Sequence, residues 1–421
     1  MSAAACSAAA PDADFAGAKA AAGDLASIGA AADFAAAKAA ADSAATRAPA
    51  DFAAAKAAAD FAATRAPADF AAAKAAADFA ATRAPADFAA AKAAADFAAA
   101  QWSRATGAGL DPHEYQRVTG ALESVADWGP AFDRAGREHL RRAADEGSPL
   151  SAGERLLTAA RWFHVATLAP FAGAERAAAA ADDALGRALA LLEPDARRVR
   201  GAEFTGWLRG PADAARTVIV VPGLDSAKEE FLDLVSALLA RGLAVFAMDG
   251  PGQGALAATT TVRADYHRVV GRAIDALGVP RVAVVGLSLG GYYAAETAAR
   301  EPRVAAAATV SGPFRLDWDE LPGPVRDILT RRAGSAEAAR AFARQVDLSD
   351  LAPRITAPLL TVDGGQDVIP GVTNGQPLAG LAPHGVHLSV PHGDHLLGNA
   401  RPDWLPHVAD WITQALTGTP A

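Results

Sequence analysis

The stretch Val284-Val-Gly-Leu-Ser-Leu-Gly-Gly-Tyr-Tyr293 places a serine between glycines. The pattern G-x-S-x-G at Gly286, Ser288 and Gly290 is a weak signal alone, because the chain has 37 glycines. Apolar residues 282–285 predict a strand directly before it, and the residues after it favour a helix. This placement is typical of a nucleophile elbow, where a tight turn exposes the serine hydroxyl at the end of a strand. We therefore predict that Ser288 is a nucleophile rather than a structural turn residue.

The chain on both sides of this motif alternates between apolar strands and helices. The expected strands are 203–209, 217–221, 244–248, 282–285, 304–310, 359–362 and 387–390, and the expected helices are 229–241, 266–277, 292–300 and 404–416. Such an alternation predicts an α/β fold with a mostly parallel sheet that helices cover on both faces. Ligand sites in these sheets lie beyond the carboxyl ends of the strands.

A nucleophilic serine needs a base, and the base needs a group that orients it. His392 and His395 follow the last expected strand, and we favour His395 as the base with His392 as its rival. Asp363 and Asp367 follow the preceding strand. Asp363 lies at the strand end and is expected to make the turn, so we predict Asp367 as the orienting carboxylate.

Attack on a carbonyl also requires N–H donors for the developing oxyanion. Leu289 supplies one backbone amide directly after the serine. The second donor is expected in the loop after strand 217–221, where Gly223 permits a tight turn and the amide of Leu224 or of Asp225 could point at the site; we favour Leu224. The alternative is that this loop only caps the next helix, through Asp225 or Ser226.

The segment Asp249-Gly-Pro-Gly-Gln-Gly254 invites comparison with a phosphate-binding loop. It does not match G-x-x-x-x-G-K-[ST] and contains no lysine. We therefore predict a structural turn at this place.

Composition limits the classes of partner and cofactor. The net charge of −9 argues against nucleic acid, so a small-molecule substrate is expected. Cys6 is the only cysteine, which excludes an internal disulfide and a zinc site with several Cys ligands. We predict an enzyme without cofactor or metal and with no membrane contact. The first residues lack the basic region typical of a secretion signal, so we expect the protein in the cytoplasm. A homodimer is left open.

An 18-residue alanine-rich unit repeats near the start of the chain, beginning at Asp33, Asp51, Asp69 and Asp87. Alanine favours helix, and Pro49, Pro67 and Pro85 predict a break or kink once per unit. The array lacks large side chains for a core. We interpret 1–100 as a low-complexity helical or disordered extension without catalytic parts, with an interaction arm as the alternative.

Composition changes at Gln101, after which residues 101–200 are richer in Trp, His, Leu and Arg. Helical spacing there, with a turn and a helix start near 147–154, predicts a helical module of about 100 residues. We predict that 201–421 form the catalytic domain and that 101–200 form a cap-like module beside it.

Together these motifs resemble one branch of the α/β-hydrolase superfamily, the branch of 2,6-dihydroxypseudooxynicotine hydrolase, the fermentation-respiration switch protein and fungal polyketide-shortening hydrolases. The resemblance lies in residues 223–230, 249–254, 286–293 with 301–303, and 393–395 with Asn399; it also includes the helical segment at 127–128 and 159–164. It spans about residues 115–416. It implies the α/β-hydrolase fold and a helical region that packs over the active site.

The resemblance also implies reactions. The branch includes enzymes that hydrolyse a carbon–carbon bond beside a ketone, and esterase-like enzymes. In one member an extra acidic residue after the strand following the elbow assists catalysis, and Glu320 is its nearest counterpart here, with Asp317 and Asp319 as rivals.

We predict a serine hydrolase acting on a carbonyl-containing small molecule, with hydrolysis of a carbon–carbon bond next to a ketone as one reaction left open. The first alternative is a carboxylesterase, thioesterase or peptidase on the same triad. The second alternative is a binding or regulatory protein that keeps the fold without turnover.

Overall fold

The structure, a computed structural model, describes residues 67–211 and 216–417. The chain forms two compact units, Met1–Ala89 and Ala90–Ala421. The repeats that begin at Asp33 and Asp51 lie wholly or largely outside the described residues. Their structure and their dispensability therefore stay predictions.

Helix α2 (Pro67–Gly107) contains the last two repeats. It runs through Pro85 as one helix, so the break that we expected at this proline is wrong. A proline in a helix removes one backbone hydrogen bond, whereas the surrounding alanines have the highest helix propensity of all residues. Long alanine-rich flanks on both sides can therefore keep the helix continuous.

A helical module follows in the second unit, with the last turns of α2 as its first part. Its other helices are α3 (Pro112–Thr119), the short 3₁₀ helix η1 (Val125–Asp127), α4 (Trp128–Asp145), α5 (Pro149–Ala166) and α6 (Ala174–Leu192). Aromatic residues hold α2 to this module: Phe97 meets Trp128 edge to face with ring centroids 4.8 Å apart. The buried hydroxyl of Tyr115 donates a hydrogen bond of 2.7 Å to the carbonyl of Ala98.

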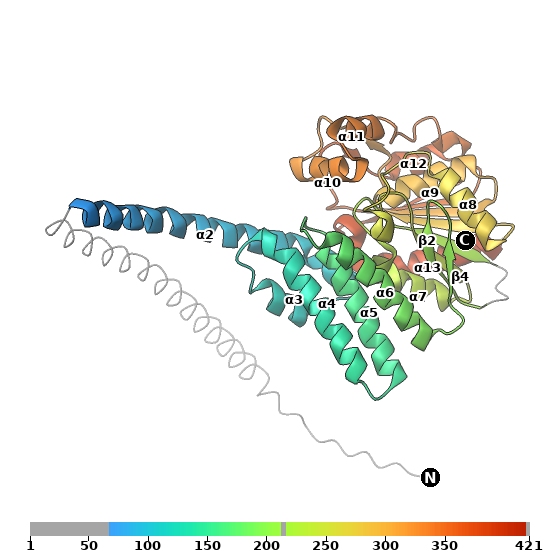
Figure 1. The fold of residues 1–421 in the computed structure, drawn as a ribbon. Helices are drawn as coiled ribbons and strands as arrows, with labels where there is room; N and C mark the ends of the chain where they lie inside the picture. Colours follow the sequence, from blue (N-terminus) through green and yellow to red (C-terminus); the bar gives the residue numbers. More distant parts are fainter. Residues whose placement is uncertain (1–66, 212–215, 418–421) are drawn as a thin grey trace, which may run out of the picture. The chain divides into compact units, whose positions relative to one another are not determined.

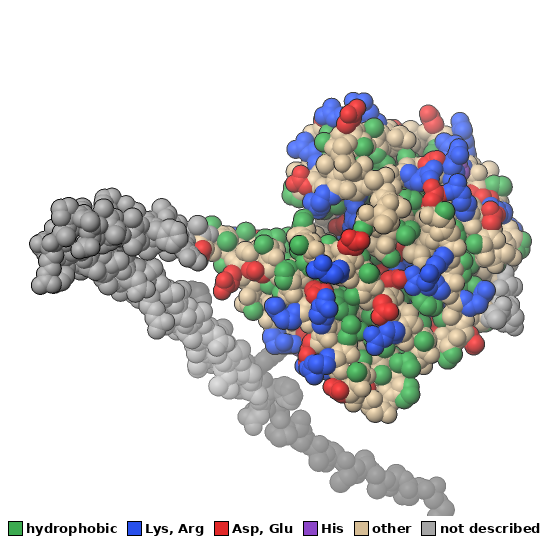
Figure 2. Space-filling model, viewed as in Figure 1, with side chains coloured by type: hydrophobic (Ala, Val, Ile, Leu, Met, Phe, Trp, Pro, Cys, Tyr) green, Lys and Arg blue, Asp and Glu red, His purple; other side chains and the backbone are tan. Residues whose placement is uncertain are grey.

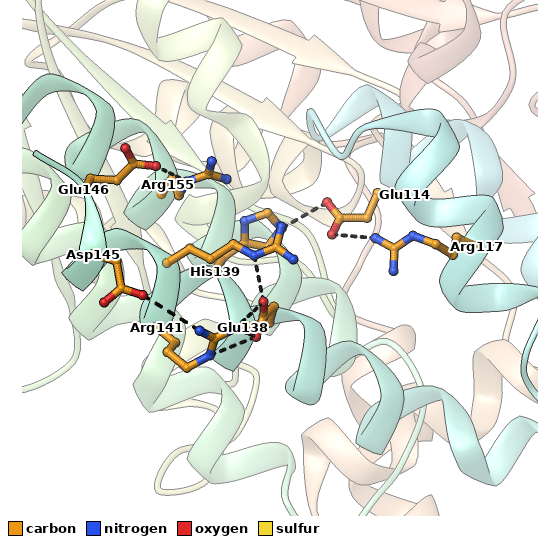
Figure 3. Close-up of polar contacts among 9 residues, drawn as sticks. Glu114, Arg117, Glu138, His139, Arg141, Asp145, Glu146 and Arg155 are labelled. Carbon is orange, nitrogen blue, oxygen red and sulfur yellow. Dashed lines mark hydrogen bonds and ion pairs between the residues drawn. The ribbon is translucent and has the colours of Figure 1, made fainter. Parts of the chain in front are cut away.

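Polar contacts join the outer helices of the module (Figure 3). His139 on α4 lies 2.9 Å from Glu114 on α3 through its Nε2 atom, and Arg155 on α5 pairs with Glu146 at the end of α4. Each contact connects neighbouring helices, so the module is held by side chains from α3, α4 and α5 together.

An eight-stranded sheet forms the other part of the unit (Figure 1). Its strands, in spatial order, are β1 (Arg197–Arg200), β2 (Thr205–Arg209), β4 (Ala244–Asp249), β3 (Thr217–Val221), β5 (Val282–Leu287), β6 (Val304–Val310), β8 (Leu359–Gly364) and β10 (Gly385–Val390). The pairs from β4 to β10 are parallel, whereas β2 is antiparallel to both of its neighbours. The predicted fold class, with its mostly parallel sheet, is confirmed.

Helices cover both faces of this sheet because alternate strand residues point to opposite sides. On β3, Ile219 and Val221 belong to the core shared with α8 (His267–Leu277) and α9 (Leu289–Arg300). Val218 and Val220 belong to the opposite core, shared with α7 (Leu232–Leu239) and α13 (Arg401–Thr417). Both cores are apolar, which explains why these strands are nearly continuous runs of Val, Ile, Leu and Ala.

Several elements were absent from the sequence prediction. They are the edge strand β1, a small sheet of β7 (Arg315–Leu316) and β9 (Val372–Thr373), and the helices α10 (Gly323–Ala333), α11 (Ala336–Ala343) and α12 (Gln376–Leu381). The expected helix 229–241 is in fact the 3₁₀ helix η2 (Lys228–Phe231) followed by α7. These elements are short, and α10 buries only one residue, Leu329, so their apolar periodicity is weak.

Basic and acidic side chains are interspersed over the face of the molecule shown in Figure 2. In residues 67–211 and 216–417, no helix is both long enough and apolar enough to cross a membrane.

Candidate active site

Ser288 lies between β5 and α9, where the sequence predicted a tight turn. Its backbone has φ 54° and ψ −129°, a strained conformation for a residue with a side chain. The flanking glycines are required by space: a Cβ atom on Gly286 would lie 1.8 Å from the carbonyl oxygen of Gly290, and one on Gly290 would lie 2.3 Å from that of Val221. The turn therefore presents the Ser288 hydroxyl at the carboxyl end of the sheet, as the elbow interpretation requires.

A chain of three side chains meets at this point. His395 Nε2 lies 3.0 Å from Ser288 Oγ, and His395 Nδ1 lies 3.0 Å from each carboxylate oxygen of Asp367. An ionised carboxylate only accepts, so in the neutral imidazole Nδ1 carries the proton and Nε2 can accept from the serine. The Asp367 side chain is 1% exposed, and that of His395 is 38% exposed. This is the geometry of a nucleophile, a base and an orienting group.

The rivals of these residues lie elsewhere. His392 is exposed and its Nε2 lies 3.2 Å from Asp403, away from Ser288. Asp363, at the end of β8, is buried, and its nearest histidine contact is His387 at 3.7 Å. Burial, with the charge of Asp367 nearby, raises the pKa of the Asp363 carboxyl to about 7. The structure thus joins His395 and Asp367 to Ser288 and separates the two alternatives from it.

Two backbone amides lie beside Ser288. Leu289 is the first residue of α9, where N–H groups have no partner within the helix. Gly223 contacts the serine from the other side, since a Cβ atom on it would lie 2.8 Å from Ser288 Cβ and 3.2 Å from Oγ. Within the described residues, no hydrogen bond uses the amide of Leu289 or of Leu224 as donor. Both amides are therefore free to receive an oxyanion.

Gln253 determines the direction of the Leu224 amide. Its Nε2 donates to the carbonyl oxygens of Pro222, at 2.6 Å, and Gly223, at 3.1 Å. In a planar trans peptide the C=O and the following N–H point in opposite directions. Because the Gly223 carbonyl faces Gln253, the Leu224 N–H faces away from Gln253.

The Gln253 amide is itself fixed. Its Oε1 accepts from the Gly250 amide at 2.9 Å and from the Tyr266 hydroxyl at 2.8 Å, and the residue is fully buried. The segment 249–254 is therefore a turn, as the sequence indicated, but a turn that also holds the loop beside Ser288.

The acidic candidates after β6 lie apart from these groups. Glu320 is exposed, and no hydrogen bond or ion pair in the described part of the chain joins it to Ser288 or His395. Asp319 pairs with Arg340 on α11 at 2.6 Å, and Asp317 accepts from the Asp319 amide. None of the three is brought to the serine.

A cavity of about 290 Å³ lies between the helical module and the loops at the carboxyl end of the sheet. It is lined by His164 and by the segment 167–171 next to α5, by α6, by the loop residues 225–227, by 254–258 and by the C-terminal part of α10. Much of this lining is alanine, which leaves an open apolar space. Asp225, the residue after Leu224, belongs to this lining, whereas Ser288 and His395 do not.

Comparison with known proteins identifies the fold family. Residues 218–417 match the Alpha/beta hydrolase family. The chain is 29% identical to 2,6-dihydropseudooxynicotine hydrolase of Paenarthrobacter nicotinovorans over 332 residues, which cover 73% of this chain and 90% of that protein. The chain has the α/β-hydrolase fold, and residues 218–417 carry the match to that family. The resemblance inferred from the motifs is thereby confirmed.

Solved structures agree with this assignment. The crystal structure of 2,6-dihydroxy-pseudo-oxynicotine hydrolase matches this α/β-hydrolase with a TM-score of 0.69 and 26% identity, covering 76% of this chain and 97% of that chain. Among sequence relatives, Hydrolase LUC6 of Fusarium sp is 34% identical over 163 residues, which cover 33% of this chain and 39% of that protein. The structure of AbyA5, at 19% identity and a TM-score of 0.57, shares the fold.

Arg104 connects the helical module of this α/β-hydrolase to the loop beside Ser288. From the last turn of α2 it donates to Asp225 at 3.0 Å, to Ser226 at 3.0 Å and to both oxygens of Glu230. His164 of α5 adds a contact of 2.9 Å to Glu230. The predicted alternative, a helix cap by Asp225 or Ser226, is wrong: no side chain caps η2, and both side chains instead bond to Arg104.

A second buried cluster fixes the other end of this loop. Lys228, with its side chain completely buried, donates from Nζ to Asp249 at 2.7 Å and lies 2.7 Å from Glu229 and 2.9 Å from Asp182 of α6. The Lys228 backbone amide also donates to Asp249. The loop of this α/β-hydrolase is thus held by α2, α6 and the turn after β4 at once.

Ser311 was missed by the sequence analysis. It follows β6 with φ 51°, and its hydroxyl accepts a hydrogen bond of 2.9 Å from the amide of Leu396, directly after His395. Leu396 and Leu397 also have positive φ, so the histidine loop is strained and needs this support. The sequence signals for Ser311, Gln253 and Arg104 are single residues in loops or at a helix end, and only tertiary contacts reveal them. Among the described residues there is no group of three or more His, Cys, Asp or Glu that could hold a metal ion.

Proposed function

We propose that this α/β-hydrolase cleaves a bond next to the carbonyl group of a small molecule, with Ser288 as nucleophile. The observation that supports this most directly is the continuous chain from Ser288 through His395 to Asp367, with contacts of 3.0 Å. His395 takes the serine proton as Oγ attacks the carbonyl carbon, and Asp367 stabilises the imidazolium. His395 then returns the proton to the leaving group, and water hydrolyses the acyl-enzyme.

The negative charge that develops on the carbonyl oxygen is received by the amides of Leu289 and Leu224. Leu289 directly follows the serine and Leu224 follows Gly223, which contacts the serine; neither amide has another acceptor in the described residues. One such donor in an oxyanion hole contributes about 2.7–4 kcal/mol to the activation free energy. Glu320 takes no part in this mechanism, because it lies exposed and apart from the serine.

The bond that we propose is a carbon–carbon bond beside a ketone. Support comes from the branch resemblance and from the 29% identity over 90% of the length of 2,6-dihydropseudooxynicotine hydrolase. The leaving group would be a carbanion, so a ketone or phenol must delocalise its charge until His395 protonates it. An ester, thioester or amide substrate on the same triad is the alternative.

The cavity supports a small-molecule substrate. Its volume of about 290 Å³ is close to the lower end of the range of ligand pockets, and it lies between the helical module and the loop after β3. The helices α5 and α6 would cover the substrate and limit the access of water while the acyl group is transferred.

Labelling with a fluorophosphonate probe tests the serine mechanism. We expect a covalent adduct on Ser288 in the folded protein, and none in the Ser288→Ala variant. Absence of the adduct from folded wild-type protein would contradict the serine mechanism and would favour a binding or regulatory protein without turnover.

Product analysis tests which bond is cleaved. A β-diketone and an aryl ketone are offered beside a 4-nitrophenyl ester, and carboxylic acid and ketone products are separated by chromatography. Cleavage of the ester alone, with both ketones intact, would overturn the carbon–carbon proposal and leave the esterase alternative.

A further inference from the structure

Two arginines at the end of α10, Arg331 and Arg332, line the cavity without an ion pair in the described residues, and Arg331 is exposed to solvent. Arg332, near the end of α10, lines the cavity and is partly buried. Across residues 67–211 and 216–417, no hydrogen bond or ion pair joins its guanidinium to a carboxylate. A cation withdrawn from water without a partner is unfavourable, so its position calls for a physical explanation.

The buried carboxylates that line the cavity near Arg332 form their ion pairs with other cations, although Arg104 and Lys228 are each shared by more than one carboxylate. Asp225 lines the same cavity but pairs with Arg104 at 3.0 Å. Glu229 also lines it and lies 2.7 Å from Lys228. Glu175 of α6 is exposed to solvent, where water and salt screen its charge.

Arg104 and Arg332 differ in whether nearby carboxylates offset the effect of burial on the pKa. Burial lowers the pKa of Arg104, but Asp225 and Glu230 outweigh this and leave the pKa raised. Burial also lowers the pKa of Arg332, and the more distant Asp225 does not restore it. The first guanidinium is a satisfied structural group, whereas the second has donors left for a ligand.

The remaining lining of the cavity is mostly apolar and small. Ala169, Ala178 and Ala181 line one side, and Ala255, Ala257 and Ala258 line another. A ligand that fits must have an apolar body and one anionic group, because a carboxylate can accept two hydrogen bonds from a guanidinium.

We propose that Arg332 binds a carboxylate carried by the substrate, so that the enzyme prefers carbonyl compounds with an apolar body and an acidic end. Asp225, which lines the cavity, directly follows Leu224 in the chain, and the proposal requires that one substrate extends from the oxyanion site to the guanidinium. This inference rests on the proposed function, and the experiment separates the two.

Two esters of equal chain length test the charge preference. They are the 4-nitrophenyl monoester of adipic acid, which ends in a carboxylate, and 4-nitrophenyl hexanoate, which ends in a methyl group. We expect wild-type kcat/KM to be higher for the adipate ester. In Arg332→Gln it should fall about 10-fold to 100-fold for this ester, since a hydrogen bond to a charged group contributes about 1.5–3 kcal/mol. The hexanoate ester should lose less than about threefold.

Arg326→Gln is the matched control, because Arg326 lies on the same helix outside the cavity lining. Arg332→Lys should keep part of the preference, and Arg332→Glu should reverse it. A wild-type enzyme without preference, or an equal loss for both esters in Arg332→Gln, would overturn the inference.

Protection from labelling supplies a second readout that needs no turnover of either ester. Hexanoate anion should slow fluorophosphonate labelling of Ser288 in wild type more than hexanamide does, and this difference should vanish in Arg332→Gln. If Ser288 is labelled without any such difference, the charge proposal is wrong and the hydrolase stands. If Ser288 is not labelled at all, the proposed function itself fails.

Discussion

Arg104 on α2 donates to both carboxylate oxygens of Glu230, from Nε at 2.6 Å and from Nη2 at 2.9 Å. Burial raises the pKa of Glu230, but the charge and hydrogen bonds of Arg104 lower it well below its usual range. The pair joins a helix of the N-terminal module to the loop that begins beside the serine. A helix remote in sequence thus fixes one wall of the active site.

Replacing Arg104 should damage both stability and catalysis. Arg104→Met leaves Glu230 and Asp225 without their shared cation, with His164 still in contact with Glu230, and this costs about 3–5 kcal/mol in the free energy of unfolding. Displacement of the loop should also lower kcat by about 10-fold to 100-fold. Chemical denaturation and steady-state kinetics measure the two effects.

The double variant Arg104→Met/Glu230→Leu separates these effects. It should recover part of the lost stability, because Glu230 no longer stays buried as an unpaired charge, whereas Asp225 still lacks its cation; kcat should stay low. Recovery of wild-type kcat would contradict the positioning role. Arg141→Met, at an exposed ion pair with Glu138, is the control and should change stability by less than about 1 kcal/mol.

Gln253→Glu should reduce kcat with little effect on KM. A carboxylate still accepts from Gly250 and Tyr266, but it cannot donate to the carbonyls of Pro222 and Gly223. The peptide before Leu224 would then lose its fixed orientation, with a fall in kcat of about 100-fold. Gln414→Glu, at an exposed position of α13, is the control. A change in KM alone would point to a role in substrate binding instead.

Asp363→Asn should stabilise the protein, and more so at alkaline pH. The folded-state pKa of about 7 is raised above the value near 4 of an unfolded aspartate. Between these two pKa values the folded state holds a proton that the unfolded state has released, so wild-type stability falls as pH rises from about 4 to about 7. The asparagine removes this loss of stability, which is about 1.4 kcal/mol for each pH unit between the two pKa values.

Thermal unfolding at pH 4, 6 and 8 measures this difference. The Tm of Asp363→Asn minus that of wild type should grow with pH. A difference that is the same at all three pH values would refute the explanation, and Asp350→Asn, at an exposed aspartate, controls for the loss of one surface charge.

Two truncated chains that begin at different residues should differ in thermal stability. A chain that begins at residue 90 keeps the whole second unit, whereas a chain that begins at residue 101 loses Phe97 and Ala98. Phe97 packs partly buried against Trp128 and Ala98 is buried, so the shorter chain should unfold at a lower temperature. Thermal unfolding followed by circular dichroism measures the two Tm values. Equal Tm values would show that residues 90–100 do not contribute to stability.

Much of the fold was predictable from local patterns. The apolar runs at Thr217–Val221 and Val304–Val310 are strands as predicted, and α9 begins directly after Ser288. Strands buried on both faces have continuous apolar sequences, so they are easy to recognise. In contrast, β1 has three arginines in four residues, and α10 packs only one buried side chain, so neither has a clear pattern.

The sequence by itself predicted the order Ser288, Asp367, His395 for the proposed triad, because a parallel sheet brings the loops after successive strands to one edge. Only the tertiary structure decided between His395 and His392 and between Asp367 and Asp363, since side chains a few residues apart in one loop point in different directions. It also revealed Arg104, Gln253 and Arg332. Their roles depend on contacts with residues distant in the chain, or on the absence of such contacts within the described residues, and no local pattern encodes either.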